Sequence, residues 1–586
     1  MPARLVTRGS MQIILSVAIA LVCAPVVAQS MLRVVGPKTL DPDRPHLLRV
    51  EEQTKQGWRL VDPAALVVGV EGPASLVQDP SRQAMNPVTV RPDAREGAFT
   101  VNAAQGDRSA SASFAIGPQA PAGSVRLQIN PSRVLHEFQG LGGGVLFYDN
   151  QWELSQGDEI WKWCFEDVHA TYLHLLARPD YERANDNDDW RTIDPAGFDF
   201  KASNRALKVA ERALAIDPNL KLYLSVYSPP AWMKVGETTR GSAGLKAGKA
   251  YRQEFAEYVF AYLKHAASRG VRFEYFAPFN EPDWTHSQDG MHVKDFAELV
   301  GLFDDITTAL AELIEADDDL EMPRLIFPDS LGAGALTRTR ENRAVLTANR
   351  RMLEEKVDVW GVHDYWNTAG YWPVRFEELR ALPPVGAKPI WMTEWAQRDN
   401  RGDLESANQY GANILNALRS GAQAWMVFEW CHPSGNQSGL ISCDWGAKPP
   451  HKRYWRSQAY YTFQQLANTT PAGAQVVDVS AELSGIAKPS SKGQSLPVEY
   501  LALKTPQGMV LHVANTTGEP VTVEVEWRGD GGPAGGALVT DALRHSRPFT
   551  TDELALRTNR RSASFTAPAN SLVTVVGWVE PAEGER

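Results

Sequence analysis

Two glutamates in this 586-residue chain stand at the ends of strand-like segments, where they could present a pair of carboxyl groups. Glu281 follows the aromatic and β-branched run 271–279 and precedes Pro282, whose missing N–H ends strand pairing. Glu394 ends a second apolar run, 389–393. Two carboxyl groups on separate strands are suited to glycosidic-bond cleavage, because one can protonate the leaving oxygen while the other attacks the sugar or activates water.

A pair of glutamates is weak evidence by itself, since 70 residues of the chain are Asp or Glu. The specific features are the Asn280-Glu281-Pro282 motif and the second strand-end glutamate, which follows 394 − 281 = 113 residues later. The alternative is that both side chains are solvated loop carboxylates.

The elements that must position these glutamates alternate between strand and helix patterns over residues 135–468. Predicted strands are 144–148, 172–177, 222–227, 273–279, 325–328, 359–364, 390–393 and 424–428, and helical patterns include 202–215, 251–269, 293–316, 404–419 and 454–467. The glycine-rich segment 138–144 is predicted to form a turn before the first strand. Eight strands with intervening helices predict a (β/α)8 TIM barrel, whose chemistry gathers at the C-terminal strand ends, here of strands four and seven.

Two all-β regions flank the predicted barrel. Short alternating strands between residues 31 and 119 predict an N-terminal immunoglobulin-like β-sandwich. A second β-sandwich is predicted from residues 470–584 together with 124–134, so that the barrel is inserted after the first strand of that sandwich. The expected fold class is therefore α/β, a barrel with a C-terminal β-sandwich and an N-terminal β domain.

The first 28 residues have the pattern of a secretory signal peptide. Arg4 and Arg8 precede the apolar run 13–22, and small residues lead to a predicted cleavage site after Ala28. We therefore expect a secreted or periplasmic protein, with no membrane span once the signal is removed. The formal charge of −11 argues against a nucleic-acid partner. Oligomeric state is not predicted.

No cofactor and no metal site are expected from the sequence, which lacks a Cys/His pattern with zinc spacing. Three cysteines remain after Ala28. Cys431 and Cys443 flank a segment rich in Gly and Ser, and export makes a disulfide between them plausible, although three reduced buried thiols are the alternative. The acidic run Asp186-Asn187-Asp188-Asp189 could meet hydroxyls or a calcium ion, but its irregular spacing favours a solvated turn.

Residues 125–584 resemble glycoside hydrolase family 30, of the clan of retaining (β/α)8 glycosidases. The motifs that carry the resemblance are Gln139-Gly140-Leu141-Gly142-Gly143, Ser228-Pro229-Pro230-Ala231-Trp232-Met233-Lys234, Asn280-Glu281-Pro282, His363-Asp364-Tyr365, Thr393-Glu394 and Lys452-Arg453-Tyr454. The resemblance implies that Glu281 is the acid/base and Glu394 the nucleophile, an assignment that the residues alone leave open.

The resemblance also implies residues that contact the substrate. Asn280 matches the residue that hydrogen-bonds the sugar 2-hydroxyl, and Tyr365 matches the strand-six tyrosine that steadies the nucleophile. His363 lies two residues before Tyr365, so strand alternation places both on one face. The chain departs from the family at Tyr227, where a tryptophan is usual, and at Asp364; Tyr227 and His363 are nevertheless predicted to bind the substrate, with Asn280 and Tyr365. The expected strand-two arginine is ambiguous between the positions of His174 and Arg178, and we take Arg178 as the candidate.

Eighteen tryptophans are more than a chain of this length usually carries, and aromatic rings cover the apolar faces of sugars. Those in predicted strand-end loops are Trp232, Trp284, Trp366, Trp395, Trp430 and Trp445, of which we single out Trp232 and Trp430 as substrate-binding candidates. The leading hypothesis is a secreted retaining β-glycosidase that acts on a polysaccharide or oligosaccharide. The alternatives are a carbohydrate-binding pseudo-enzyme on the same barrel and an inverting or transglycosylating variant.

Overall fold

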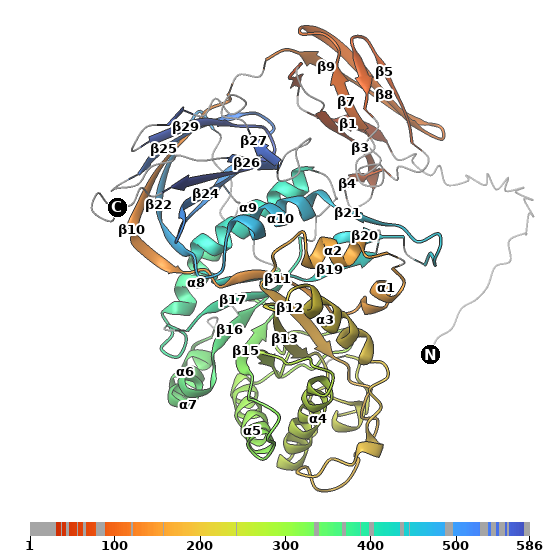
Figure 1. Cartoon of the computed structure of the whole chain (residues 1–586), viewed down its shortest axis with the longest axis vertical. Coiled ribbons are helices and arrows are strands. Elements are labelled where there is room, and N and C mark those ends of the chain that lie inside the picture. Colours follow the sequence, from red (N-terminus) through yellow and green to blue (C-terminus); the bar gives the residue numbers. More distant parts are fainter. Residues whose placement is uncertain are drawn as a thin grey trace, which may run out of the picture.

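The computed structural model describes residues 31–578 of the chain with internal gaps. The gaps are residues 37, 43–45, 55–56, 62–65, 78–87, 119–120, 156, 242, 333–338, 366–370, 387, 398–403, 434–438, 445, 487–495, 528–536, 541–546, 550–556 and 559–561. The described chain forms an N-terminal β domain, a central barrel and a C-terminal β-sheet (Figure 1). The predicted signal peptide lies outside the described residues.

Eight parallel strands close into a barrel in the order in which they occur along the chain. They are β11 (Gly140–Val145), β12 (Tyr172–Ala177), β13 (Lys221–Val226), β14 (Tyr275–Ala277), β15 (Arg324–Ser330), β16 (Val359–Val362), β17 (Ile390–Trp395) and β18 (Ala424–Val427). The predicted (β/α)8 fold is therefore confirmed.

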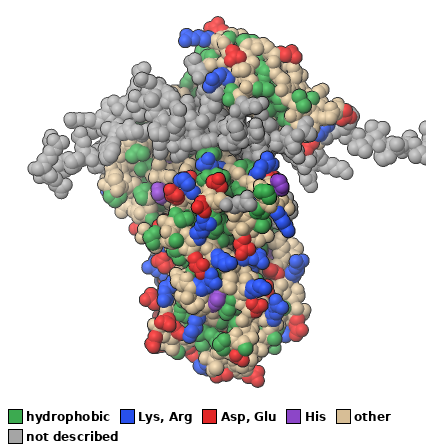
Figure 2. All heavy atoms as spheres, turned by 45° about the vertical axis from the view of Figure 1, so that its right-hand side comes forward, with side chains coloured by type: hydrophobic (Ala, Val, Ile, Leu, Met, Phe, Trp, Pro, Cys, Tyr) green, Lys and Arg blue, Asp and Glu red, His purple; other side chains and the backbone are tan. Residues whose placement is uncertain are grey.

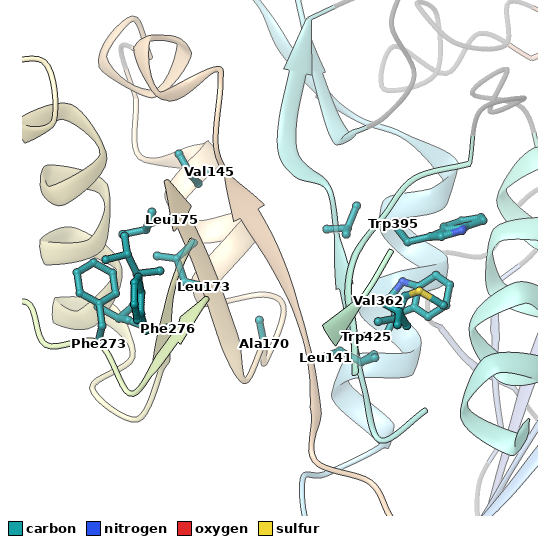
Figure 3. Close-up of a cluster of buried hydrophobic side chains, with 14 of the residues drawn as sticks. Leu141, Val145, Ala170, Leu173, Leu175, Phe273, Phe276, Val362, Trp395 and Trp425 are labelled. Carbon is teal, nitrogen blue, oxygen red and sulfur yellow. The ribbon is translucent and has the colours of Figure 1, made fainter. Parts of the chain in front are cut away.

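Side-chain alternation along these strands separates two apolar layers. Tyr172, Tyr223 and Tyr275 point inward and fill the barrel together with Trp391 and Met426. Their neighbours in sequence point outward and pack under the helices. Figure 3 shows two groups of these outer side chains, one around Leu173, Leu175 and Phe276 and one around Val362, Trp395 and Trp425. The filled interior makes the barrel a rigid support for the groups at its rim.

Helices follow each of the first seven strands, mostly close to the predicted ranges. They are α1 (Asp149–Glu153), α2 (Glu159–Phe165), α3 (Asn204–Ile216), α4 (Lys249–Ala267), α5 (Phe296–Glu315), α6 (Arg340–Ala348), α7 (Arg350–Lys356), α8 (Trp372–Arg380) and α9 (Leu404–Ser420). α5 begins at the N-cap Asp295, whose carboxylate accepts a hydrogen bond from the backbone N–H of Ala297.

The prediction of a glycine-lined turn over 138–144 is wrong, because most of that segment is the first barrel strand, β11. The glycines are required by close neighbours. A Cβ on Gly142 would lie 2.4 Å from the Tyr172 carbonyl oxygen, and one on Gly144 would lie 2.2 Å from the Phe428 carbonyl oxygen. β11 thus lies too close to its neighbours for larger side chains, and its glycines gave no strand signal because they lack β-propensity.

The chain after β18 differs from the prediction. A small sheet of β19 (Glu429–Pro433), β20 (Gly439–Cys443) and β21 (Tyr454–Arg456) precedes α10 (Gln458–Thr469), so the predicted helix 454–467 begins later, at the N-cap Ser457.

The predicted disulfide is also absent, since Cys164, Cys431 and Cys443 are free, buried thiols. Pairing of β19 with β20 places Cys443 opposite Pro433, although the Cys431 and Cys443 thiols lie close enough to hydrogen-bond.

The N-terminal domain has two sheets around one apolar core, as predicted. One sheet contains β1 (Leu32–Val35), β3 (His46–Thr54), β4 (Gly57–Leu60), β6 (Ala74–Leu76) and β7 (Val88–Pro92), and the other contains β2 (Thr39–Leu40), β5 (Val67–Glu71), β8 (Gly97–Gln105) and β9 (Arg108–Ile116). In Figure 1 this domain is drawn at the upper right, above the small sheet that contains β21.

The C-terminal region forms one ten-stranded sheet rather than two separate sheets. Its strands are β10 (Ser124–Glu137), β22 (Gln475–Ser484), β23 (Val498–Thr505), β24 (Gly508–Asn515), β25 (Val521–Trp527), β26 (Ala537–Thr540), β27 (Arg547–Phe549), β28 (Arg557–Thr558), β29 (Ser562–Ala567) and β30 (Ser571–Trp578). β10 pairs with both β22 and β25, which confirms that the strand before the barrel joins this region.

The C-terminal sheet encloses its own core on one face and packs on α9 and α10 with the other. At this interface the buried carboxylate of Glu499 forms an ion pair of 2.7 Å with Arg419 and accepts a hydrogen bond of 3.0 Å from Asn416, both on α9. The side chain of Gln465 on α10 donates to the Thr574 hydroxyl at 2.8 Å. These buried polar contacts fix the sheet against the barrel helices.

Acidic and basic side chains are intermixed on the face of the barrel that Figure 2 shows. Among the described residues, no helix is long and apolar enough to cross a membrane.

Gly144→Ala should destabilise the barrel by about 1–3 kcal/mol, because the new methyl group meets a backbone carbonyl that cannot move aside without shifting a strand. Gly301→Ala is the matched control: Gly301 lies within α5, a methyl group added to it would have nothing within 4 Å, and alanine there should stabilise the helix by about 0.5–1 kcal/mol. Thermal unfolding of the two variants measures the contrast. Equal midpoints would contradict the close packing of β11.

Candidate active site

The two predicted glutamates meet at the C-terminal end of the barrel. Glu394 lies on β17, whereas Glu281 follows the end of β14 by four residues. Both are buried, with 8% and 4% of Glu281 and Glu394 exposed, respectively. An oxygen of each carboxyl group and a ring nitrogen of His363 all lie within 4.8 Å of one another. The structure therefore brings the carboxyl pair together at strands four and seven, as the sequence predicts.

His363 lies between the carboxyl groups and is fully buried. Its Nδ1 is 2.9 Å from Glu281 Oε1 and 3.7 Å from Glu394 Oε1, and its Nε2 is 3.4 Å from Asp329 Oδ1. Burial lowers the pKa of His363, but the charges of Glu394 and Asp329 outweigh burial and raise it well above the usual value. The protonated imidazole therefore supplies positive charge to three acidic groups.

Two tyrosine hydroxyls hold Glu394. Tyr227 donates to Oε2, and Tyr365 donates to Oε1 at 2.8 Å. Burial and the charge of Glu394 raise the pKa of both tyrosines well above the usual value, so both hydroxyls keep their protons and remain donors. With both oxygens engaged, the Glu394 carboxylate is fixed in orientation.

The pKa of Glu394 is raised to about 7, first by burial and further by the negative charge of Glu281. His363 and the two tyrosine hydroxyls act in the opposite direction and favour the ionised form. Like charges this close thus disfavour the ionised form of Glu394.

Three neighbouring strand ends hold an acidic residue in the left-handed backbone region. Glu281 has φ 44°, Asp329 has φ 59° and Asp364 has φ 46°. The backbone N–H of Glu281 donates to the Asp329 carbonyl at 2.8 Å, and that of His363 donates to the Ser330 carbonyl at 2.8 Å. Such backbone conformations cost about 1–2 kcal/mol each for residues with a side chain, and their clustering marks a site where orientation is imposed by the surrounding fold.

Asp329 is a site residue that the sequence prediction missed. Its buried carboxylate accepts hydrogen bonds of 2.6 Å from Tyr223 and 2.5 Å from Thr393, besides its ion pair with His363. Burial raises the pKa of Asp329, but His363 and these hydroxyls lower it below the usual value overall, so it is ionised and orients His363. Its position at the end of β15 was the available signal.

Glu429 was missed as well. It follows β18 and is fully buried, and its carboxyl group accepts the backbone N–H of Phe147 at 2.7 Å and that of Leu146 at 3.2 Å. The ring of Phe147 meets Tyr227 edge to face, with 5.2 Å between centroids. Glu429 thus holds the loop after β11 so that Phe147 supports a residue that contacts Glu394.

Asn280 is 3% exposed, and its Oδ1 is buried without a hydrogen-bond partner, so it is free to accept a bond from a substrate hydroxyl. Arg178 is directed elsewhere: it forms an ion pair of 3.1 Å with Asp149 and donates to the Leu146 carbonyl at 3.2 Å, which ties two rim loops together. His174 stacks on Tyr223 inside the barrel, and burial lowers its pKa to about 3, so it is neutral.

The tryptophans do not form one sugar platform. Trp430 does not take its predicted role: it is fully buried in the core between Phe165 and Phe463, because it packs against the glycine-rich β11. Trp395 is also in the core. Trp232 is partly buried in the turn Ala231–Met233 and packs on Tyr251, and Trp284 is 42% exposed. Trp366 and Trp445 lie outside the described residues.

The spacing of Glu281, His363 and Glu394 would also suit ligands of a metal ion. With no ion between them, the raised pKa of His363 gives the group a positive charge in its middle.

The fold and this strand-end carboxyl pair resemble those of glycoside hydrolase barrels, and comparison with known proteins supports the likeness. Residues 180–301, which contain Glu281, match the model described as the glycosyl hydrolase family 30 TIM-barrel domain. The resemblance to glycoside hydrolase family 30 is thus confirmed.

Known relatives are distant. A segment of 74 residues is 31% identical to "Putative glucosylceramidase 1" of Caenorhabditis elegans. The matched segment makes up 12% of this chain and only 14% of that protein. The catalytic domain of family 30 xylanase C from Talaromyces cellulolyticus aligns with a TM-score of 0.60 at 18% identity, over 77% of this chain and 99% of that one. A family 30 subfamily 8 xylanase from Clostridium acetobutylicum aligns with a TM-score of 0.58 at 18% identity, over 78% and 100%. At this identity the structural likenesses establish the fold.

Tyr227→Phe should move the acidic limb of the pH profile of kcat/KM to higher pH by about one to two units, measured with an aryl β-glycoside. The Tyr227 hydroxyl lowers the pKa of Glu394, and a hydrogen bond to a charged group contributes about 1.5–3 kcal/mol, where 1.36 kcal/mol corresponds to one pKa unit. Tyr460→Phe, which removes a hydroxyl bonded to the Trp163 carbonyl, is the control. An acidic limb that stays in place in Tyr227→Phe would show that Tyr227 does not tune Glu394.

Proposed function

We propose that the protein is a retaining β-glycoside hydrolase that cleaves a polysaccharide or oligosaccharide by double displacement, with Glu281 as acid/base and Glu394 as nucleophile. The observation that carries the proposal is the closeness of two buried carboxyl groups at strands four and seven, with oxygens within 4.8 Å. Retaining enzymes hold their carboxyl groups about 5–5.5 Å apart, whereas inverting enzymes leave about 6.5–9.5 Å so that a water molecule fits between carboxylate and sugar. The short spacing favours direct attack.

In the first step, a Glu394 oxygen attacks the anomeric carbon while the bond from that carbon to the glycosidic oxygen breaks. Glu281 gives its proton to the departing oxygen, so the aglycone leaves as a neutral alcohol and a glycosyl ester remains on Glu394. The different surroundings of the two residues support this assignment. Both oxygens of Glu394 accept tyrosine hydroxyls, which favours the ionised form that a nucleophile needs.

In the second step, the Glu281 carboxylate takes a proton from water as the water oxygen attacks the same carbon and releases Glu394. Two inversions give a product with the original β configuration. His363 contacts Glu281 at 2.9 Å and lies 3.7 Å from Glu394, so its positive charge reaches both carboxyl groups as the proton and negative charge change places. Asn280 supplies a free acceptor for a sugar hydroxyl next to Glu281.

The substrate is proposed only as a class, a β-linked glycan. The relatives named above are described as a glucosylceramidase and as xylanases, which differ in sugar. In this chain Tyr227 donates a hydrogen bond to the proposed nucleophile, Glu394. Phe147 and Phe428 pack beside Tyr227, and the centroids of these two phenylalanine rings are 6.1 Å apart. These rings and the half-buried Trp232 offer apolar surface for sugar faces.

We also propose that the protein is exported, on the strength of the leader pattern over residues 1–28. Expression of the whole chain in a Gram-negative host should yield a periplasmic protein whose N-terminal residue is Gln29. Recovery of a cytoplasmic protein that still carries residues 1–28 would contradict export.

The proposed function is tested by a screen of xylan, β-1,6-glucan, β-1,6-galactan and aryl β-glycosides with wild type, Glu281→Gln and Glu394→Gln. Each variant should lose about 10³-fold or more in turnover of the active polysaccharide, since each lacks a group that the first step requires. On an aryl glycoside with a very acidic leaving phenol, Glu281→Gln should retain far more activity than Glu394→Gln, because that leaving group departs without protonation. Wild type should first release the β-anomer, observed by proton NMR.

Glu274→Gln is the matched control. Glu274 directly precedes β14, the strand that Glu281 follows, so it lies at the opposite end of the barrel, 3.9 Å from Lys221. It should retain wild-type activity. Wild-type turnover by Glu394→Gln would overturn the nucleophile assignment, and release of the α-anomer would show inversion. Binding of a glycan without turnover would favour the pseudo-enzyme.

A further inference from the structure

A second cluster of acidic side chains lies away from the proposed catalytic pair, between the loop that follows β12 and the helix α4. Asp186, Glu254 and Glu257 each offer a carboxylate oxygen, and these three oxygens lie within 4.8 Å of one another. Two ligands on opposite sides of an ion at about 2.4 Å would be about 4.8 Å apart, so the three oxygens fit around one calcium-sized ion.

Several oxygens of this cluster have no hydrogen-bond donor, and Glu254 and Glu257 lie close enough to interact with each other. Both oxygens of Glu257, one oxygen of Glu254 and Oδ1 of Asp186 are buried without a hydrogen-bond partner. Glu254 and Glu257 are 6% and 1% exposed. Within the described residues, no Lys, Arg or His forms an ion pair with any of them. Burying unpaired carboxylates is costly, so their arrangement indicates a missing positive charge.

Glu182 lies outside that trio and is a further buried acidic side chain, whose charge interacts with Asp186 and Glu254. The residue is 1% exposed, and neither of its carboxylate oxygens has a hydrogen-bond partner. A fourth buried carboxylate near the trio makes a chance cluster of surface acids a poor explanation, since exposed acids avoid one another or are solvated.

Asp186 is held in a position that leaves one oxygen for a ligand. Its Oδ2 accepts the Asp194 backbone N–H at 2.6 Å and the Asn187 side chain at 2.9 Å, whereas Oδ1 accepts nothing. Gly197 packs so closely that a Cβ there would be 2.4 Å from the Asp186 Cβ. The loop is therefore folded around Asp186, while Glu254 and Glu257 come from one turn of α4.

We propose that Asp186, Glu254 and Glu257 bind one calcium ion, which fastens the loop after β12 to α4. Calcium takes six to eight oxygen ligands and accepts several carboxylates, whereas magnesium keeps much of its water and uses one or two. The cluster offers no nitrogen or sulfur ligand, which zinc and copper prefer. The acidic run at Asp186, expected from sequence to be a solvated turn, thus contributes a ligand because partners from a distant helix complete the site.

The ion would stabilise a loop that borders the catalytic end of the barrel. The loop begins at Arg178, whose carbonyl accepts the Tyr258 hydroxyl of α4 at 2.7 Å, and Tyr181 stacks on Tyr258 with 4.3 Å between ring centroids. The calcium ion would add a further link between this loop and α4. Its role is structural and does not depend on the proposed glycosidase activity.

The test uses the mature full-length protein after treatment with EGTA and removal of the chelator. Isothermal titration with CaCl2 should give about one site per chain, and saturating calcium should raise the thermal unfolding midpoint by about 5 °C relative to EGTA. Titration with MgCl2 should bind at least about tenfold more weakly. No calcium heat together with no change in the midpoint would overturn the proposal, and equal affinity for magnesium would overturn the assignment to calcium.

Glu254→Gln and Glu257→Gln keep the side-chain volume and remove one negative charge each. Both variants should bind calcium at least about tenfold more weakly and lose most of the calcium-dependent shift, yet unfold in EGTA at the wild-type temperature or above, because repulsion among the carboxylates is reduced. This combination distinguishes a metal site from simple loss of structure. Glu298→Gln, an exposed glutamate on the neighbouring α5, is the control and should behave as wild type. Wild-type calcium affinity in both cluster variants would overturn the proposal.

Discussion

Two carboxyl groups buried side by side repel each other, and the catalytic end of the barrel is organised around that constraint. His363 lies between them and carries a proton because Glu394 and Asp329 outweigh the effect of its burial. Tyr227 and Tyr365 donate hydrogen bonds to the two oxygens of Glu394. Asp329 forms an ion pair with Nε2 of His363, the ring nitrogen that does not contact Glu281. Each of these groups depends on the same scaffold, a barrel whose interior is filled by aromatic side chains and whose strand ends hold Glu281, Asp329 and Asp364 in a left-handed backbone conformation.

The parts predictable from sequence were those encoded locally. Strands such as 172–177 were predicted from a run of aromatic, branched and apolar residues, and the structure places β12 at Tyr172–Ala177. The Asn280-Glu281-Pro282 motif located one carboxyl group, and the apolar run before Glu394 located the other. Joining of β10 to the C-terminal sheet was also predictable, because an isolated strand before the barrel needs partners and only the later strands could supply them.

The parts that were missed depend on contacts between distant segments. The strand Gly140–Val145 has no strand propensity, and its glycines are explained only by the closeness of Tyr172 and Phe428. Trp430 looked like a rim residue, although the space beside Gly143 lets it pack inward. Asp329 had no motif around it, and its role follows from His363 on the next strand. The acidic run at Asp186 had no regular ligand spacing because its partners, Glu254 and Glu257, lie on α4.

The central claim is that Glu394 forms a covalent bond to the sugar while Glu281 protonates the leaving group. The most direct measurement is the mass of the intact protein, and of its proteolytic peptides, after incubation with an activated 2-deoxy-2-fluoro-β-glycoside of the sugar that the enzyme accepts. The account predicts one glycosyl adduct per chain, on the peptide that contains Glu394, and none in Glu394→Gln. An adduct on a different residue, or inactivation that leaves the mass of the Glu394 peptide unchanged, would contradict it.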